Sequence, residues 1–78
     1  MRLDEANPGD VVIVKGVDTS EQSTLKLMTF GIVEGSMVRC ISKLYTSMEI
    51  DLYGTRFAIS NHTANAFICE LADAPLVG

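Results

Sequence analysis

Alternation of apolar and polar residues recurs in short runs along this chain and predicts several short β-strands. The segments 37–42 (MVRCIS), 49–54 (EIDLYG) and 55–60 (TRFAIS) alternate with a period of two, which is typical of strands with one buried face. Two further runs, 10–17 (DVVIVKGV) and 67–71 (FICEL), are apolar and bounded by turn residues. The core-facing positions that we expect in the last four strands are Val38, Cys40, Ile50, Leu52, Phe57, Ile59, Phe67, Cys69 and Leu71.

One helix is predicted between the first two strands, from about residue 19 to residue 30. Asp18 and Glu21 form a D-x-x-E pair, the polar arrangement that satisfies free N–H groups at the start of a helix. Leu27 and Phe30 lie three residues apart, so they form one apolar stripe along the helix. We expect this stripe to face the sheet.

Turn residues separate these segments at the places where the chain must reverse. Gly31 is expected to end the helix in the left-handed conformation. Gly9 and Gly35 suit the turn positions that need a positive φ. Ser60 is placed to cap a single helical turn across residues 61–66.

The order of these elements predicts a mainly β fold: about five short strands with one α-helix inserted after the first. Strands this short bury one another best when the sheet curls into a small barrel. A chain of 78 residues has room for one domain with one modest core. We expect residues 1–72 to form this domain and residues 73–78 to be a flexible C-terminal tail.

Composition and charge exclude several classes of partner. Ten carboxylates against six Lys and Arg give a formal charge of −4, and the basic residues are scattered. A protein that binds nucleic acid or an anionic membrane usually carries a basic cluster, so neither partner is expected. No apolar run has the length of a membrane span, and the first ten residues lack a secretory signal. We therefore predict a cytoplasmic location without membrane insertion.

Side chains able to carry catalysis or bind a metal are few and poorly spaced. His62 is the sole imidazole, and Cys40 and Cys69 occupy core-facing strand positions, which favours inert thiols. His62, Glu70 and Asp73 hold the right atoms for a transition metal, but their spacing does not place two ligands on one wall. We predict no enzyme activity, no cofactor and no metal site.

Apolar residues outside the predicted core favour a protein-interaction surface. Leu25 and Met28 form a second stripe on the helix, which one helix on a small barrel cannot bury together with the first. Further apolar residues follow the helix or lie in the loop between the second and third strands. Exposed apolar patches usually mark partner sites, or the contact between two copies of a chain. The predicted partner-binding residues are Leu25, Met28, Val33, Leu44, Tyr45 and Met48.

The order and spacing of three segments resemble the FeoA family. These segments are 26–40 (KLMTFGIVEGSMVRC), 49–60 (EIDLYGTRFAIS) and 64–71 (ANAFICEL). The resemblance implies an SH3-like β-barrel with an inserted helix. It also implies a non-enzymatic accessory or regulatory protein of bacterial ferrous iron uptake, whose partner is the cytosolic GTP-binding domain of the FeoB membrane transporter.

Three departures from the family pattern limit what the resemblance implies. Glu34 stands where the family usually has proline, the loop at residues 44–48 (LYTSM) differs from the family loop, and the chain lacks the basic character of many relatives. Two alternatives therefore stay open. One is a small metal-responsive protein that binds iron directly through His62 and nearby carboxylates. The other is a stand-alone SH3-like module related to the C-terminal domain of iron-dependent repressors.

Overall fold

The computed structural model of the chain describes residues 1–72, so the tail expected at 73–78 lies outside the described residues. One helix follows the first strand and a short helix precedes the last, with three consecutive strands between them. The elements are the 3₁₀ turn η1 (Leu3–Glu5), β1 (Val11–Val17), α1 (Gln22–Thr29), β2 (Met37–Lys43), β3 (Ser47–Leu52), β4 (Thr55–Ser60), α2 (Asn61–Ala64) and β5 (Phe67–Leu71).

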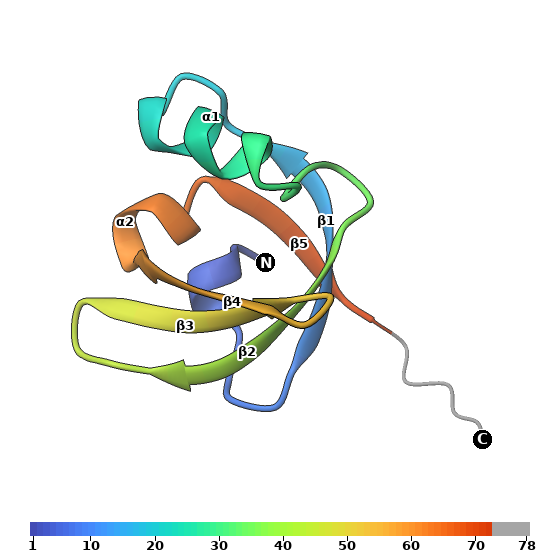
Figure 1. Ribbon diagram of the computed structural model, residues 1–78, viewed down its shortest axis with the longest axis vertical. Coiled ribbons are helices and arrows are strands. Elements are labelled where there is room, and N and C mark those ends of the chain that lie inside the picture. The colour runs from blue at the N-terminus through green and yellow to red at the C-terminus, as the bar shows by residue number, and fades with distance from the viewer. Residues whose placement is uncertain (73–78) are drawn as a thin grey trace.

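All five strands belong to one antiparallel sheet with the order β4-β3-β2-β1-β5. The sheet curls strongly, and α1 and α2 lie on its open side (Figure 1). The pairing register shifts between Val14 and Gly16 in β1 and between Cys40 and Ser42 in β2. Such bulges bend and twist a strand, which helps the sheet to curl. The predicted mainly β fold with a helix after the first strand is confirmed.

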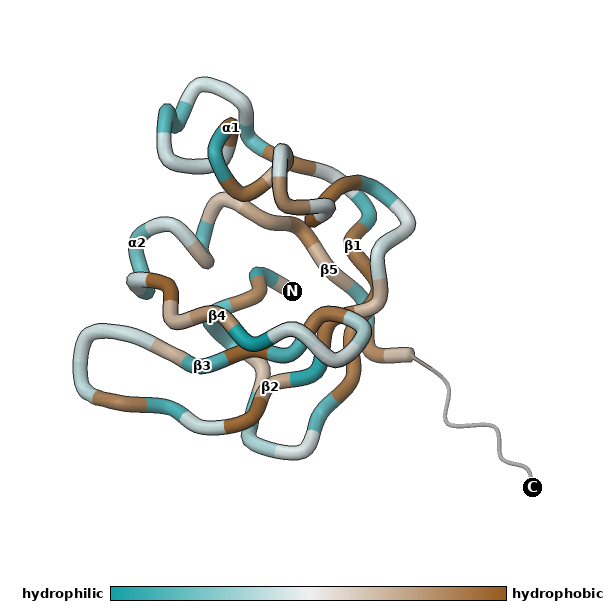
Figure 2. Tube along the Cα trace, viewed as in Figure 1, coloured by the Kyte–Doolittle hydropathy of each residue, from teal (hydrophilic) through white to brown (hydrophobic). Residues whose placement is uncertain are grey.

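The core lies inside the curl and is made by one face of each strand. Val38, Cys40, Ile50, Leu52 and Ile59 are buried, as the alternating pattern predicts. The buried side chains of the other strands, the 3₁₀ turn and the helix complete the cluster. Figure 2 shows apolar residues along the strands, whereas the loop between β1 and α1 is polar. The remaining core residues are Leu3, Ala6, Val12, Val14, Leu27, Ile32, Met48, Ala64, Phe67 and Cys69.

The predicted signals at the end of α1 and at the start of α2 are both confirmed. Gly31 has φ 104°, and Ile32 directly after it donates its N–H to the carbonyl of Leu27 at 3.2 Å. This left-handed residue ends α1 and turns the chain toward β2. At the other helix, the Ser60 hydroxyl accepts a hydrogen bond from the N–H of Thr63 at 3.1 Å and caps α2.

The predicted start of α1 is wrong by three residues, because the helix begins at Gln22 and not near residue 19. The Asp18 carboxylate accepts hydrogen bonds from the N–H and the hydroxyl of Ser20, at 3.0 and 2.6 Å. A short polar side chain that bonds the backbone two residues ahead stabilises a turn in competition with the helix. The D-x-x-E pair therefore makes a turn and not a capping box.

Two residues predicted to face the core are exposed. Phe30 is 52% exposed because α1 ends at Thr29, so Phe30 leaves the helical stripe that Leu27 begins. Leu71 is 59% exposed because it is the last residue of β5, beyond the buried Phe67 and Cys69. Phe57 is only partly buried, and it packs against the core cluster.

The outer edge of β5 is covered by the N-terminal residues. The Met1 ammonium donates to the carbonyl of Cys69 at 3.0 Å, and the N–H of Cys69 donates to the carbonyl of Met1 at 2.6 Å. Arg2 forms a β-bridge with Ile68, and the next residue, Leu3, is fully buried. The edge strand β5 is thus paired on both sides.

Candidate partner-binding groove

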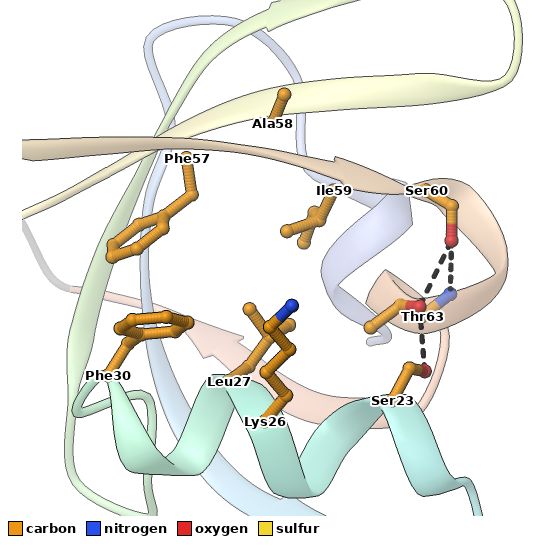
Figure 3. A pocket seen from close by; sticks show the side chains of 9 residues that line it. All are labelled: Ser23, Lys26, Leu27, Phe30, Phe57, Ala58, Ile59, Ser60 and Thr63. Atoms are coloured by element: carbon orange, nitrogen blue, oxygen red, sulfur yellow. Dashed lines mark hydrogen bonds between the residues drawn. The ribbon is translucent and has the colours of Figure 1, made fainter.

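An open groove of about 310 Å³ separates α1 from the edge strand β4. Apolar side chains from both elements point into it, Leu27 and Phe30 from the helix and Phe57 and Ile59 from the strand (Figure 3). The arrangement follows from the sequence, because Phe57 and Ile59 share one face of β4, and α1 presents Leu27 and Phe30 across the gap. The other residues that line the groove are Ser23, Lys26, Ala58, Ser60 and Thr63.

Two aromatic rings divide this groove from a second hollow. The rings of Phe30 and Phe57 lie 5.5 Å apart between centroids and are tilted by 43°, a favourable geometry for an aromatic pair. Beyond them lies a hollow of about 540 Å³ at the β3–β4 turn, lined by both rings and by Gly31, Leu52, Tyr53 and Thr55. The two hollows together follow the length of β4.

Polar side chains close the other end of the groove by joining α1 to α2. The hydroxyls of Ser23 and Thr63 lie 2.8 Å apart, and the Ser60 hydroxyl donates to Thr63 at 3.0 Å (Figure 3). Beside them, His62 Nε2 lies 2.9 Å from Glu21 Oε1. The hydrogen bond from Ser23, and then the one with His62, lower the pKa of Glu21 below its ordinary value.

Lys26 is the one charged residue that lines the groove. Within residues 1–72 it forms no ion pair, since the two ion pairs found there are Arg56–Glu49 and His62–Glu21. The chain as a whole has a formal charge of −4. The groove therefore presents a positive charge beside apolar walls on an otherwise acidic protein.

The six predicted partner-binding residues do not line this groove. Leu25 is 52% exposed, Leu44 67% and Tyr45 100%, whereas Met28 is half-buried. Val33 is 39% exposed in the turn after α1. In Figure 1 the β2–β3 turn, which carries Leu44 and Tyr45, lies well away from α1. The six residues therefore do not form one patch.

Met48 corrects one of these predictions. The sequence predicts Met48 as a partner-binding residue in the loop between the second and third strands, but Met48 lies in β3 and is fully buried. The strand begins at Ser47, so alternation places Met48 on the same inner face as Ile50. Met48 is a core residue and cannot contact a partner.

The sequence pattern missed the groove because its walls look like core residues. Leu27, Phe57 and Ile59 have the spacing of buried positions, and they are indeed buried or partly buried. A signal was available at Phe30, because Gly31 was recognised as the residue that ends the helix. A side chain at the last position before that glycine lies at the rim of the groove and not beneath the helix.

Within residues 1–72, neither Cys40 nor Cys69 forms a hydrogen bond with His62, since Cys40 contacts Ser42 and Cys69 contacts Phe67. Cys40 and Cys69 are buried free thiols, and burial raises the pKa of Cys69 to about 11 and that of Cys40 above its ordinary value. Across residues 1–72, no cluster of three His, Cys, Asp or Glu side chains is placed to hold a metal ion. His62 Nε2 and Glu21 Oε1 lie 2.9 Å apart, but no third side chain of these types joins them within the described residues. No helix in this part of the chain has the length and apolar character needed to span a membrane.

A curled five-stranded antiparallel sheet with a helix after its first strand defines an SH3-like β domain. The FeoA domain model matches residues 1–71, and the chain belongs to this family. The resemblance seen in the sequence is thus confirmed. FeoA proteins are accessory factors of ferrous iron transport and are not a known enzyme family.

Solved structures of FeoA proteins share the fold. An iron uptake regulatory protein, FeoA, is 25% identical, with a TM-score of 0.83 over 92% of this chain and 97% of that one. A FeoA-like protein from Clostridium acetobutylicum is 20% identical, with a TM-score of 0.84 over 100% and 93%. FeoA from Stenotrophomonas maltophilia, solved with zinc, is 22% identical, with a TM-score of 0.81 over 90% and 89%. No curated protein matches this chain.

Proposed function

We propose that this chain is a non-enzymatic accessory protein of bacterial ferrous iron uptake that binds the cytosolic GTP-binding domain of a FeoB-type transporter. Family membership supports the role in iron transport. The observation that carries the docking proposal is the open groove between α1 and β4, with Phe30 half-exposed at its rim. The proposal places the chain in the cytoplasm, where that domain lies.

The groove has the features of a binding hot spot. Hot spots are well-packed apolar pockets around an aromatic anchor, surrounded by polar residues that exclude water. Here Phe30 and Phe57 form the anchor, and the Ser23–Thr63–Ser60 hydroxyls and Lys26 supply the polar rim. We propose that Leu25, Met28 and Val33 extend the contact along α1 and the turn after it. Leu44 and Tyr45 stay a separate prediction, because the β2–β3 turn lies elsewhere.

The proposed mechanism is a shift in the conformation of the GTP-binding domain. A bound protein changes a conformational equilibrium only when it binds one state more tightly than the other. The affinity should therefore differ between the GTP-bound and GDP-bound forms of the domain, and binding should change nucleotide affinity by the same factor.

The experiment is a calorimetric titration of the full chain with the soluble GTP-binding domain, loaded with GDP or with a non-hydrolysable GTP analogue. Phe30→Asp should weaken binding about 30-fold, which corresponds to about 2 kcal/mol. Tyr45→Asp is the matched control, because Tyr45 is fully exposed and does not line the groove. Normal binding by Phe30→Asp, with loss of binding in Tyr45→Asp, would move the site to the β2–β3 turn.

The titration also separates docking from direct binding of iron. The metal hypothesis depends on His62, which has Glu21 as its neighbouring carboxylate at 2.9 Å. Docking predicts that His62→Ala binds the GTP-binding domain as the unmodified chain does. Domain binding by the unmodified chain that requires added ferrous iron, and that is lost in His62→Ala, would favour the metal hypothesis. The relation to iron-dependent repressors stays an untested alternative.

A further inference from the structure

The outer edge of β4 is open within residues 1–72. The sheet ends at β4 on one side and at β5 on the other, and the N-terminal residues pair with β5 alone. No described strand pairs with the outer side of β4. Ser60 at the end of β4 is also the N-cap of α2, so its carbonyl accepts the first hydrogen bond of that helix. An edge of this kind presents unpaired N–H and C=O groups to a partner.

The register shows which groups face outward. Asn61 donates its N–H to the carbonyl of Thr46 at 2.9 Å, so this pair is hydrogen-bonded. Hydrogen-bonded and non-bonded pairs alternate along an antiparallel ladder. Arg56, Ala58 and Ser60 therefore belong to the non-bonded pairs with β3, and their N–H and C=O groups point away from the sheet.

This open edge borders the groove. Ala58 and Ser60 both line it and alternate along β4 with the inward-pointing side chains of Phe57 and Ile59. The Ala58 methyl group points away from α1 (Figure 3), so the main chain of β4 borders the groove at this point. One surface thus combines free main-chain groups with apolar hollows on either side of the Phe30–Phe57 pair.

We propose that the groove receives an extended segment of the partner protein, which pairs with the outer edge of β4 as a sixth strand. Main-chain hydrogen bonds to Arg56, to Ala58 and to the N–H of Ser60 would hold the segment, and its alternate side chains would enter the two hollows. An extended segment fits better than a helix, because a helix satisfies its own N–H and C=O groups and leaves those of β4 unpaired. The inference rests on the proposed function and specifies how the GTP-binding domain is recognised.

Charge complementarity gives the chemistry of this segment. Lys26 is the one charged residue that lines the groove, and it forms no ion pair within residues 1–72. The segment should therefore carry apolar residues at alternate positions and a carboxylate that meets Lys26. A second copy of this chain fits less well, since each copy has a formal charge of −4.

The test is amide hydrogen exchange of the labelled full chain, alone and saturated with the GTP-binding domain. The amides of Arg56, Ala58 and Ser60 should exchange freely in the chain alone and at least about 10-fold more slowly in the complex. Ala58→Pro removes the central outward N–H and is tolerated in an edge strand whose N–H faces solvent. It should weaken binding about 10-fold or more, whereas the control Ala58→Ser keeps the N–H and should bind normally.

The outcomes separate the two proposals. Binding without protection of these three amides, or with full affinity in a folded Ala58→Pro variant, overturns strand addition and leaves docking in place. No binding by the unmodified chain overturns the proposed function and the inference that rests on it. Protection that appears with rising protein concentration and no partner present assigns the edge to a second copy and also overturns the inference.

Discussion

The two outer strands of the sheet differ in whether their free edge is covered. At β5 the chain covers the edge with its own main chain, through the paired hydrogen bonds between Met1 and Cys69 and the buried side chain of Leu3. At β4 no strand of the described chain covers the edge, which instead borders an apolar groove. Exposed edges invite association, and proteins usually blunt them. The contrast indicates that one end serves stability and the other serves recognition.

The two ends of the sheet also differ in the contacts that hold them in place. The β5 end is fixed by strand pairing and by fully buried side chains such as Leu3 and Phe67. Across the β4 groove, α1 is an eight-residue helix with Thr24 and Leu27 as its buried side chains. Helices this short are marginal by themselves, so α1 depends on these contacts and on the polar bridge to α2. The recognition side is therefore the more loosely attached one.

The largest expected loss of stability comes from a substitution at the covered edge of β5. Leu3→Ala removes a fully buried side chain under the N-terminal bridge. The free energy of unfolding should fall by about 3 kcal/mol, because the cavity adds to the lost burial. Urea unfolding checks this, with Leu44→Ala as the control, since Leu44 is 67% exposed and should change stability by less than about 0.5 kcal/mol. Equal effects of the two substitutions would show that the N-terminal cover is not structural.

The second prediction concerns Cys69, whose main chain pairs with Met1 at the covered edge. Burial raises the pKa of its thiol from 9.0 to about 11, a difference of 11 − 9.0, or about 2 units. At pH 8 the thiolate fraction should therefore be about 100-fold lower than in the unfolded chain. Labelling with a thiol reagent should be slow in the native protein and fast in denaturant. Rapid native labelling would mean that the edge opens, and it would contradict the prediction that this thiol is inert.

Sequence patterns predicted the fold better than the site for a physical reason. Strand alternation reports burial on one face, which is why Val38, Cys40 and Ile50 were placed correctly. It does not report where an element ends, so Phe30 was assigned to the core and Met48 to a loop. The alternation pattern also carries no information on which edge of the sheet stays unpaired. The residue that covers β5 at Cys69 is Met1, which lies 68 positions away in the sequence. The groove depends on that long-range arrangement.

A matched pair of substitutions on α1 sharpens the contrast within the open side. Leu27→Ala should lower the free energy of unfolding by about 2 kcal/mol, because Leu27 is the buried contact of the helix. Phe30→Ala should cost about 1 kcal/mol or less, since half of Phe30 is exposed and its main loss is the contact with Phe57. Urea unfolding measures both. A larger loss for Phe30 than for Leu27 would identify Phe30 as a structural residue and weaken its role as a docking anchor.

The smallest expected effect is at the polar bridge that joins α1 to α2. The hydrogen bond from Ser23, followed by that with His62, holds the pKa of Glu21 below its ordinary value of 4.5. The folded state then binds the proton of Glu21 less tightly than the unfolded state does, so stability rises with pH through this window. The contribution of Glu21 is present above about pH 4.5 and is lost as the pH falls through the lowered pKa of the folded state.

Glu21→Gln isolates this contribution, because glutamine keeps the shape and does not titrate. Urea midpoints measured from pH 7 to pH 3 should show a small deficit of the variant at neutral pH, which disappears in acid. His62→Ala should show part of the same deficit, since it removes the second of the two causes. A difference that does not vary with pH would mean that the carboxylate charge has no part in holding α1 to α2. A pH-dependent difference would show that polar side-chain contacts hold α1 in place on the open side of the sheet. At the covered edge of β5, main-chain pairing has that role.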